Sequence, residues 1–245
     1  MQVAIVTPTY NEAGNIEKLI SQIAGVCKKI PGVNFMLLVA DDNSPDGTAK
    51  LADNIGQKLK SKDFTVRILV RKKKDGIGKA YINAFNVLLK ENFDFIIQID
   101  ADLQHNPIYI KDLVAEAQKG RDFVAASRYM KGGKIEGWGL HRKILSRGGN
   151  IYTRIFLGSG LTDYTNGLNL FSVDLLKKID VNSLNSAGYG FFIELKYKAL
   201  RLSKNYVQIP ITLYGRQHGQ SKISKNIIFL NLALVPKLRF SSSNK

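Results

Sequence analysis

The sequence contains a single cysteine, Cys27, and no run of roughly 20 apolar residues. One cysteine excludes an internal disulfide bond and fits a reducing compartment. The lack of a long apolar run argues against a membrane-spanning helix within these 245 residues. Residues 1–7 have the pattern of a strand and not of a secretion signal. Any contact of this stretch of chain with a membrane is therefore expected at the membrane surface.

Acidic residues are scarce: 20 Asp and Glu stand against 36 Lys and Arg, which gives a formal charge of +16. A surplus of this size indicates an anionic partner, whether nucleic acid, a phosphorylated substrate or an anionic membrane. A lysine-rich surface that keeps a protein soluble would give the same composition. Apolar residues at 44% and charged residues at 23% are near the globular average, so the chain is expected to fold around a core.

Two common nucleotide-binding motifs are also missing. The segment DGIGKA places Gly76 and Gly78 at the start of a predicted helix. Their spacing fits neither GxGxxG nor GxxxxGK[ST], so neither a dinucleotide fold nor an ATPase loop is indicated. The amino end of that helix is still suited to phosphate, because its first backbone N–H groups lack partners.

Short apolar strands alternate with helical patterns in the first half of the chain, which predicts βαβ units around a mostly parallel sheet. The strands are nearly continuous apolar runs, as expected where helices cover both faces. Predicted strands are Val3–Val6, Phe35–Ala40, Val66–Val70, Phe95–Ile99 and Phe123–Ala126, and predicted helices are Ile16–Lys29, Gly47–Lys60, Gly78–Glu91 and Ile108–Lys119. The sequence therefore predicts a single α/β domain with a Rossmann-like, mostly parallel sheet flanked by helices.

The second half has a looser pattern. A mobile loop with four glycines is expected at Lys131–Leu140, helices at His141–Leu157 and Phe191–Leu202, strands at Leu168–Ser172 and Tyr206–Leu213, and a polar loop at Gly215–Lys222. We predict a catalytic domain over residues 1–222, with a donor and metal half (1–127) and an acceptor half (128–222). Residues 223–245 are expected to form an amphipathic interfacial helix or, alternatively, a terminal helix that packs on the core.

Polar clusters follow three of the predicted strands, and the carboxyl ends of parallel strands are where ligands bind in such sheets. Asp100, Asp102 and Gln104 follow the fourth strand and offer oxygen ligands on one turn. Such a set suits Mg²⁺ or Mn²⁺, which also takes oxygens from substrate phosphates. A DxD spacing alone is weak evidence, because a solvated acidic turn has the same letters.

The other two clusters are PTYNE (Pro8–Glu12) and DDNSPDGT (Asp41–Thr48). Pro8 and Tyr10 are expected to form the wall of a nucleotide site, with Glu12 and Asp42 as acceptors for the ribose or base. An ordinary turn followed by a helix cap would also explain part of the second cluster.

Together these motifs resemble the family 2 glycosyltransferases, and within them the dolichol-phosphate mannose synthase group. The resemblance runs from residue 8 to residue 222. It rests on PTYNE, DDNSPDGT, GIGKA (Gly76–Ala80), DADLQHNP (Asp100–Pro107), SRY (Ser127–Tyr129), Trp138 with Arg142, Ser146 and Asn150, DYTNGL (Asp163–Leu168), GYGFFIE (Gly188–Glu194) and GRQHGQSK (Gly215–Lys222).

The resemblance implies an inverting glycosyltransferase that uses a divalent cation, Mg²⁺ or Mn²⁺. It implies that Asp100, Asp102 and Gln104 hold the metal, and that Pro8, Tyr10, Glu12, Asp42 and Asp100 lie at the donor nucleotide. Phosphate binding would fall to Arg128, Arg142, Arg216, Ser221 and Lys222, and the residues closest to the chemistry would be Asp102, Arg128, Arg216 and Lys222. Asp163 and Glu194 are candidates to orient the arginines or to act as bases.

The chain departs from the group at two positions. Asn169 stands where the group commonly has arginine, and Phe192 stands where it often has glutamine. The first change puts a phosphate contact at that position in doubt.

A phosphate acceptor agrees with the basic second half of the chain. A phosphate monoester is already ionised at neutral pH, with a second pKa near 6, so it needs aiming and charge compensation more than a base. Arginine grips phosphate with two parallel hydrogen bonds. The expected partners are a polyprenyl or dolichyl phosphate, a membrane surface and a nucleotide-sugar, with GDP-mannose first because the resemblance implies that donor.

Peripheral attachment to the cytoplasmic face of a membrane is expected, with a transmembrane partner or a spanning segment of a longer protein as a further means of anchoring. The alternatives are a family 2 enzyme that uses a UDP-sugar or a hydroxyl acceptor, a catalytically dead scaffold, and a nucleic-acid-binding module. The last is disfavoured because it would give the carboxylates no role, so no nucleic acid is expected as a partner.

Overall fold

A seven-stranded sheet forms the centre of the molecule, with strand order β3-β2-β1-β4-β7-β5-β8. The computed structural model describes residues 1–186, 188–215 and 225–241, the last segment with side chains at 232–240. The strands are β1 (Gln2–Thr9), β2 (Asn34–Asp41), β3 (Phe64–Val70), β4 (Phe95–Gln98), β5 (Phe123–Ser127), β7 (Asn169–Ser172) and β8 (Tyr206–Pro210). The neighbouring pairs β1–β2, β1–β4, β2–β3 and β5–β8 are parallel, and β7 runs antiparallel between β4 and β5. The predicted α/β class with a mostly parallel sheet is confirmed.

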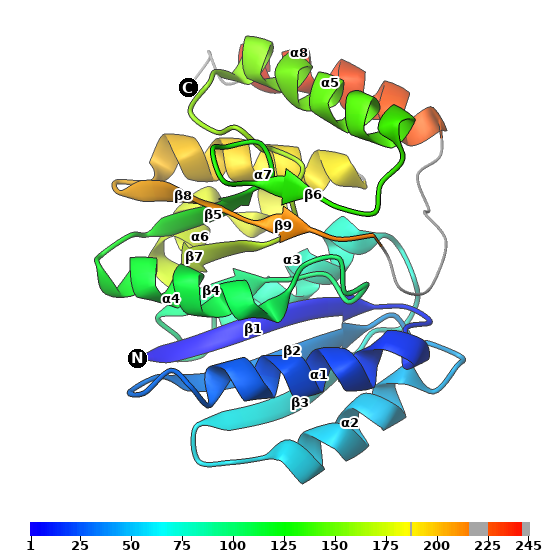
Figure 1. The fold of residues 1–245 in the computed structure, drawn as a ribbon, viewed down its shortest axis with the longest axis vertical. Helices are drawn as coiled ribbons and strands as arrows, with labels where there is room; N and C mark the ends of the chain where they lie inside the picture. The colour runs from blue at the N-terminus through cyan, green and yellow to red at the C-terminus, as the bar shows by residue number, and fades with distance from the viewer. Residues whose placement is uncertain (187, 216–224, 242–245) are drawn as a thin grey trace.

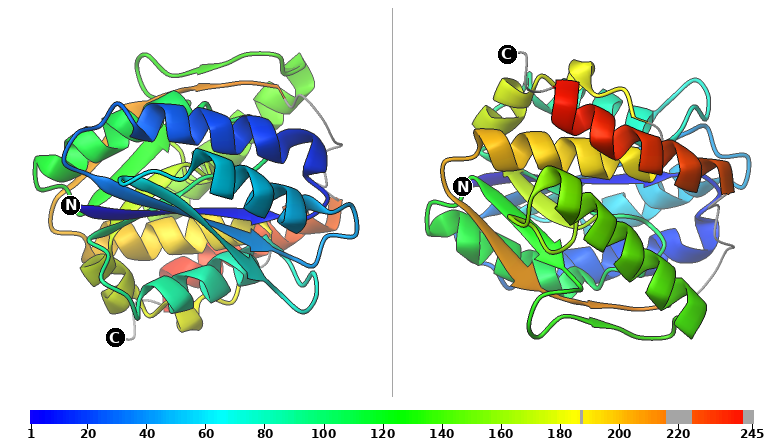
Figure 2. Two further views of the ribbon diagram at one scale, coloured as in Figure 1. Left: turned by 90° about the horizontal axis from the view of Figure 1, so that it is seen from below. Right: turned by 90° about the horizontal axis from the view of Figure 1, so that it is seen from above.

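Helices cover both faces of this sheet (Figures 1 and 2). One face packs against α1 (Ala13–Cys27), α2 (Thr48–Leu59) and α4 (Ile110–Gln118), which follows a short 3₁₀ turn at Pro107–Tyr109. The other face packs against α3 (Ile77–Leu88), α6 (Val173–Ile179) and α7 (Tyr189–Leu202). Covered on both sides, β1 and β2 bury nearly all of their residues, and this is why their sequences are continuous apolar runs.

Two further helices, α5 (Leu140–Leu157) and α8 (Lys225–Ser241), lie next to each other at one end of the molecule, beyond α7 (Figures 1 and 2). Val235 and Leu238 of α8 are buried in the core that contains α7, while Phe240 is exposed. The expected terminal helix is therefore present, and its described side chains pack on the core in part. Among the described residues, no helix is both long and apolar enough to cross a membrane.

The predicted strand over Tyr206–Leu213 is wrong as a single strand. It divides into β8, which extends the main sheet, and β9 (Thr212–Leu213), which pairs with β6 (Lys134–Ile135) in a separate two-stranded sheet. The division follows Pro210, which has no backbone N–H to continue a ladder. Pairing with β9 also gives strand structure to part of the segment predicted as a glycine-rich mobile loop.

Two short elements were not predicted: α6 and a 3₁₀ turn at Val181–Ser183. Ser172 caps α6, because its side-chain oxygen accepts a hydrogen bond from the backbone N–H of Leu175 at 3.2 Å. The helix is seven residues long and ends at Asp180, which has a left-handed backbone with φ 52°. It covers the sheet with Val173, Leu175 and Leu176, in an apolar run too short to show a helical period.

Candidate active site

The loops that follow β1 and β2 are tied together at the carboxyl edge of the sheet. Asp41 is fully buried, and its carboxylate accepts hydrogen bonds from the Thr9 hydroxyl at 2.7 Å and from the Ser44 backbone and hydroxyl at 2.8 and 2.6 Å. The backbone N–H of Glu12 donates to the Thr48 hydroxyl at 3.0 Å. Asp41 is therefore a structural carboxylate that fixes the loop.

Asp42 forms an ion pair with Arg71, which follows β3. Arg71 also pairs with Asp75 in the following loop. Burial raises the pKa of Asp42 above its usual value, and the Arg71 charge opposes this shift only in part. Arg71 thus keeps a nearly buried carboxylate in place at the edge predicted to bind the nucleotide.

Tyr10 lies beside this pair on the loop after β1, with the Lys74 ammonium 4.1 Å from its ring centroid. Pro8 is half-buried in β1, opposite Ala40 of β2, and Glu12 accepts a hydrogen bond from the Asn15 amide at 2.7 Å. Of the predicted donor-site residues, Pro8 therefore lies near the end of β1, and Tyr10, Glu12 and Asp42 lie just after β1 and β2.

Asp100 follows β4, and two neighbours define the position of its carboxylate. The hydroxyl of Tyr81 on α3 donates to Asp100 Oδ1 at 3.0 Å. On the other side, Gly167 lies so near that an added Cβ would be 3.0 Å from Asp100 Cγ and closer still to Oδ2. Tyr81 is fully buried and its ring is stacked on Phe191, with centroids 5.6 Å apart. The carboxylate is therefore held before any ligand binds.

Asp102 and Gln104 lie on the turn that follows. Leu103 between them has φ 58°, a conformation that costs a leucine energy and is found where the surrounding structure enforces it. Asp102 Oδ1 accepts from the Gln104 backbone at 3.1 Å, and the Gln104 amide nitrogen donates to the Tyr214 carbonyl oxygen at 2.8 Å. Since that nitrogen is engaged, the side-chain oxygen is the atom of Gln104 available to a metal.

The donor set fits a hard divalent cation. Asp100 and Asp102 are both partly exposed and supply carboxylate oxygens from one turn. No group of three or more His, Cys, Asp or Glu side chains suited to a metal occurs among the described residues. An ion here would take its remaining ligands from water and from substrate phosphates, which is the usual habit of Mg²⁺ in enzymes.

Arg128 lies at the end of β5 and forms a buried, two-pronged ion pair with Asp163. Its Nε and one terminal nitrogen each donate to an Asp163 oxygen at 2.6 Å, and the same terminal nitrogen donates to Thr165 at 2.7 Å. Burial acts to raise the pKa of Asp163, but the charge and hydrogen bonds of Arg128 hold it at about 2. Asp163 therefore orients Arg128 and is too acidic to serve as a base.

Arg142 and Trp138 extend this group of side chains. The Arg142 guanidinium stacks 3.7 Å from the Trp138 ring centroid, and Arg128 lies 5.8 Å from the same ring. Stacking on an aromatic face orients a guanidinium without neutralising it. Two of the predicted phosphate-binding arginines are thus brought together around one tryptophan.

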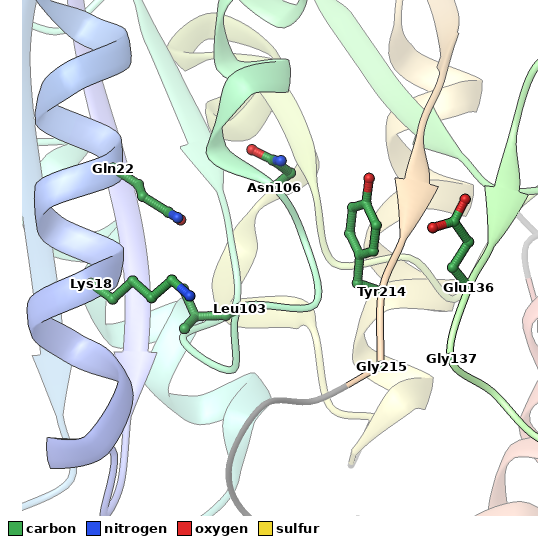
Figure 3. A pocket seen from close by; sticks show the side chains of 8 residues that line it. All are labelled: Lys18, Gln22, Leu103, Asn106, Glu136, Gly137, Tyr214 and Gly215. Atoms are coloured by element: carbon green, nitrogen blue, oxygen red, sulfur yellow. The ribbon is translucent and has the colours of Figure 1, made fainter.

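A cleft of about 620 Å³ runs beside the Asp102 turn (Figure 3). Lys18 and Gln22 of α1 point into it from one side, and Tyr214 and Glu136 stand on the other. Leu103 lines the cleft, but Asp100 and Asp102 are not among its described lining residues. The cleft is therefore adjacent to the Asp102 turn and does not include the carboxylates that are predicted to bind a metal.

A model of the family described as "Glycosyl transferase family 2" matches residues 4–180 of this chain. The chain belongs to this family. It is accordingly a glycosyltransferase, and the predicted family resemblance is confirmed.

Curated family members cover most of the chain. An undecaprenyl-phosphate mannosyltransferase of Micrococcus luteus is 39% identical over 228 residues, which are 93% of this chain and 90% of the relative. A polyprenol monophosphomannose synthase of Mycolicibacterium smegmatis is 34% identical over 90% of this chain and 80% of its own length. A dolichol-phosphate mannosyltransferase of Pyrococcus furiosus is 33% identical over 97% of this chain, which spans 64% of that relative.

Solved structures of similar fold include the glucosyl-3-phosphoglycerate synthase of Mycobacterium tuberculosis, with TM-score 0.66 and 21% identity over 98% of this chain and 81% of that one. The mannosyl-3-phosphoglycerate synthase of Rubrobacter xylanophilus has TM-score 0.67 and 20% identity over 100% and 76%. At these identities the likeness concerns the fold. The M. tuberculosis enzyme has also been solved with Mn²⁺ and UDP-glucose, so this fold accommodates a divalent cation beside a nucleotide-sugar.

Three predicted site residues, Arg216, Ser221 and Lys222, lie outside the described residues. Glu194, considered as a base, instead accepts hydrogen bonds from the backbones of Asn185 and Ser186 at 3.2 and 3.1 Å and so holds a loop. Asn169, which replaces the common arginine, is fully buried in β7, and its amide donates to Gln98 at 3.1 Å. A phosphate contact from this buried sheet position is not expected.

The sequence did not single out Tyr81, Gly167 or Lys196. Tyr81 and Gly167 both contact Asp100, and Lys196 contacts Asp163. Tyr81 and Lys196 occupy helical positions that look like ordinary core and surface positions. Gly167 was noted only as part of a family motif. Phe192, the second departure from the group, packs edge-on against Tyr81 with centroids 5.9 Å apart, behind the carboxylate and not in the site.

Proposed function

We propose that the protein transfers a mannosyl group from GDP-mannose to a polyprenyl or dolichyl phosphate, with inversion at the sugar carbon. One observation carries this proposal: Asp100 and Asp102 lie at the carboxyl edge of β4, in a chain that is 39% identical over 93% of its length to an enzyme named for mannose transfer to undecaprenyl phosphate. The arginine group around Trp138 supports an ionised acceptor.

The donor half binds and orients the nucleotide-sugar. Pro8 and Tyr10 flank the nucleotide, while Glu12 and Asp42 accept hydrogen bonds from its hydroxyl or base N–H groups. Asp100, Asp102 and Gln104 hold Mg²⁺ or Mn²⁺, a cation that compensates the charge of the departing nucleoside diphosphate when bound. Tyr81 keeps Asp100 in place at 3.0 Å, so this carboxylate needs little rearrangement when the donor arrives.

The acceptor half aims a phosphate oxygen at the sugar carbon. The oxygen forms a bond to that carbon from the face opposite the diphosphate, whose bond to the carbon breaks, and this displacement inverts the configuration. Arg128 and Arg142, with Arg216, Ser221 and Lys222, bind phosphate oxygens. A base is not required, because the acceptor is ionised at neutral pH.

Membrane attachment at the cytoplasmic face is part of the proposal, and the outer face of α5 supports it. Leu140, Ile144, Ile151 and Ile155 lie on one stripe of the helix and are 73, 63, 49 and 73% exposed. The buried side chains of α5 are on the opposite face. The helix contains four Lys and Arg residues and no Asp or Glu, as expected of a helix lying among anionic headgroups.

Vesicle sedimentation tests this attachment. The purified protein is expected to sediment with vesicles that contain anionic lipid and to remain in solution with neutral ones. Ile144→Ser combined with Ile155→Ser should weaken vesicle binding at least several-fold, because burial of each isoleucine side chain in the membrane contributes about 1.5–3 kcal/mol of binding free energy. Val70→Ser, which removes a similarly exposed aliphatic at 57% on the β3 edge, is the control. Equal binding by all three proteins would contradict a role for α5.

The reaction itself is tested by incubating the protein with Mn²⁺ or Mg²⁺, dolichyl phosphate and a panel of nucleotide-sugars, and by analysing lipids with mass spectrometry. A mannosyl phospholipid formed from GDP-mannose, and lost with Asp102→Ala or a chelator, is the expected result. A product formed only from a UDP-sugar would refute the proposed donor. Nucleotide binding without any lipid product would refute the proposed acceptor.

A further inference from the structure

Lys196 on α7 has no exposed surface, and its neighbours Leu195 and Tyr197 on the same helix are also buried. Its ammonium donates a hydrogen bond to the backbone carbonyl of Asp163 at 2.9 Å. Burial of an ammonium is costly, and burial lowers the pKa of Lys196 to about 7 against the opposing charge of Asp163. A lysine at this position therefore reduces stability relative to an apolar residue of the same size.

The groups around Lys196 form a buried charge cluster, which we define as Arg128, Asp163 and Lys196. Arg128 and Asp163 are 7 and 1% exposed and their ion pair is charge-neutral. Lys196 adds a positive charge that this pair does not match. With a pKa of about 7, Lys196 is protonated in about half of the molecules at neutral pH, and in its protonated form the cluster carries a net charge of +1.

The net charge of the cluster affects how strongly Arg128 attracts a phosphate. The ion pair with Asp163 orients the guanidinium of Arg128 but also offsets its positive charge toward any other ion. A phosphate would meet a well-placed hydrogen-bond donor with little net attraction. Lys196 and Arg128 are both bonded to Asp163, the lysine through the backbone carbonyl and the arginine through the carboxylate, so the charge of Lys196 lies close to the ion pair. In a buried setting such a charge is only weakly screened by solvent.

We propose that Lys196 is a positioning residue for the acceptor phosphate, which acts by restoring the positive charge that Asp163 takes from Arg128. The proposal rests on the proposed function, in which Arg128 binds the acceptor phosphate. It assigns orientation to Asp163 and long-range attraction to Lys196, with Arg128 as the group in contact.

Two substitutions separate the charge of Lys196 from its hydrogen bond. Lys196→Met keeps the approximate volume and removes both, while Lys196→Gln keeps a donor for the Asp163 carbonyl and removes the charge. Lys198→Met is the matched control, because Lys198 lies on the same helix, pairs with Glu194 at 3.2 Å and is partly exposed. Each protein is assayed with dolichyl phosphate and GDP-mannose for kcat and both KM values, and its thermal midpoint is recorded.

We expect both Lys196 variants to raise the KM for dolichyl phosphate by about tenfold, with the donor KM within about twofold of the original. We expect the thermal midpoint of Lys196→Met to be unchanged or higher, because a buried charge has been removed. An acceptor KM that stays unchanged in both variants would overturn the proposal. A normal acceptor KM in Lys196→Gln alone would also overturn it, since the hydrogen bond would then account for the effect.

A binding measurement separates this proposal from the proposed function. Inorganic pyrophosphate and phosphate are titrated into the original protein and the two Lys196 variants, and the rise in thermal midpoint is compared. A weaker rise in both variants supports a charge role even if the original protein forms no lipid product. Equal rises in all three proteins would overturn the charge role whatever the outcome of the activity assay.

Discussion

Replacing Gly167 with alanine tests whether the position of Asp100 matters to the chemistry. The backbone of Gly167 does not require glycine, so the effect of Gly167→Ala arises from the added methyl group alone. That methyl would lie 3.0 Å from Asp100 Cγ and closer to Oδ2, whereas carbon atoms in contact normally stay about 3.5–4.0 Å apart. The carboxylate must therefore move by roughly 0.5–1 Å, or Gly167 must move away from it.

A shift of about 1 Å at a reacting centre can reduce the rate roughly 100-fold, and metal ligands tolerate only about 0.5 Å. We therefore expect Gly167→Ala to lower kcat/KM by about 10- to 100-fold and to weaken Mn²⁺ binding in the presence of GDP. The overpacked core is also expected to lose about 1–3 kcal/mol of stability. Turnover with the polyprenyl acceptor, calorimetric titration of Mn²⁺ and thermal unfolding together measure these three effects.

Gly25→Ala is the control for this substitution. Gly25 lies within α1, where an added Cβ meets nothing within 4 Å, so alanine should stabilise the protein by about 0.5–1 kcal/mol without changing activity. If Gly167→Ala retained kcat/KM and Mn²⁺ affinity within about twofold of the original, Asp100 would not need its observed position. The assignment of Asp100 to the metal would then be refuted.

Three further substitutions probe the same region. Tyr81→Phe removes the hydroxyl that donates to Asp100. It should weaken Mn²⁺ binding several-fold in a titration and lower the free energy of unfolding by about 1 kcal/mol. An unaltered Mn²⁺ affinity would contradict a positioning role for Tyr81. Asp163→Ala leaves Arg128 buried without a counter-charge and should cost about 3–5 kcal/mol, most of which the double variant with Arg128→Met should recover in urea unfolding. The pKa of Lys196 is about 7 in the folded protein and 10.5 for an ordinary lysine, so the unfolded chain binds more protons between these two pH values. The free energy of unfolding should therefore increase with pH across that window. Lys196→Met should abolish this increase, as measured by thermal melts at pH 7 and 9.

The first half of the fold could be predicted from the sequence because its strands are parallel and covered on both faces. Such strands are short apolar runs, and the polar residues after them lie at one edge of the sheet for topological reasons. The pattern therefore predicts that Tyr10, Asp42 and Asp102 lie at the same edge of the sheet. Helix and strand ends were less well predicted; α1, for example, begins at Ala13 and not at Ile16.

The second half could not be predicted to the same degree, because its strands depend on partners far away in the sequence. Whether β7 runs parallel or antiparallel is decided by its neighbours β4 and β5, and the break between β8 and β9 by a new partner, β6. The same limit applies to side chains. The ion pair of Arg128 with Asp163 spans 35 residues, and no local pattern marks Lys196 as buried.

The carboxylates in this region are of two kinds, buried and partly exposed, which cannot be distinguished from the sequence. Asp41 and Asp163 are almost fully buried, and each accepts three or more hydrogen bonds from the protein, so neither can exchange these bonds for a ligand without a large loss. Asp100 and Asp102 are partly exposed and lie on one turn. In a chain with a charge of +16, these two are the carboxylates that we propose as ligands of a divalent cation, while Asp41 and Asp163 hold a loop and an arginine in place.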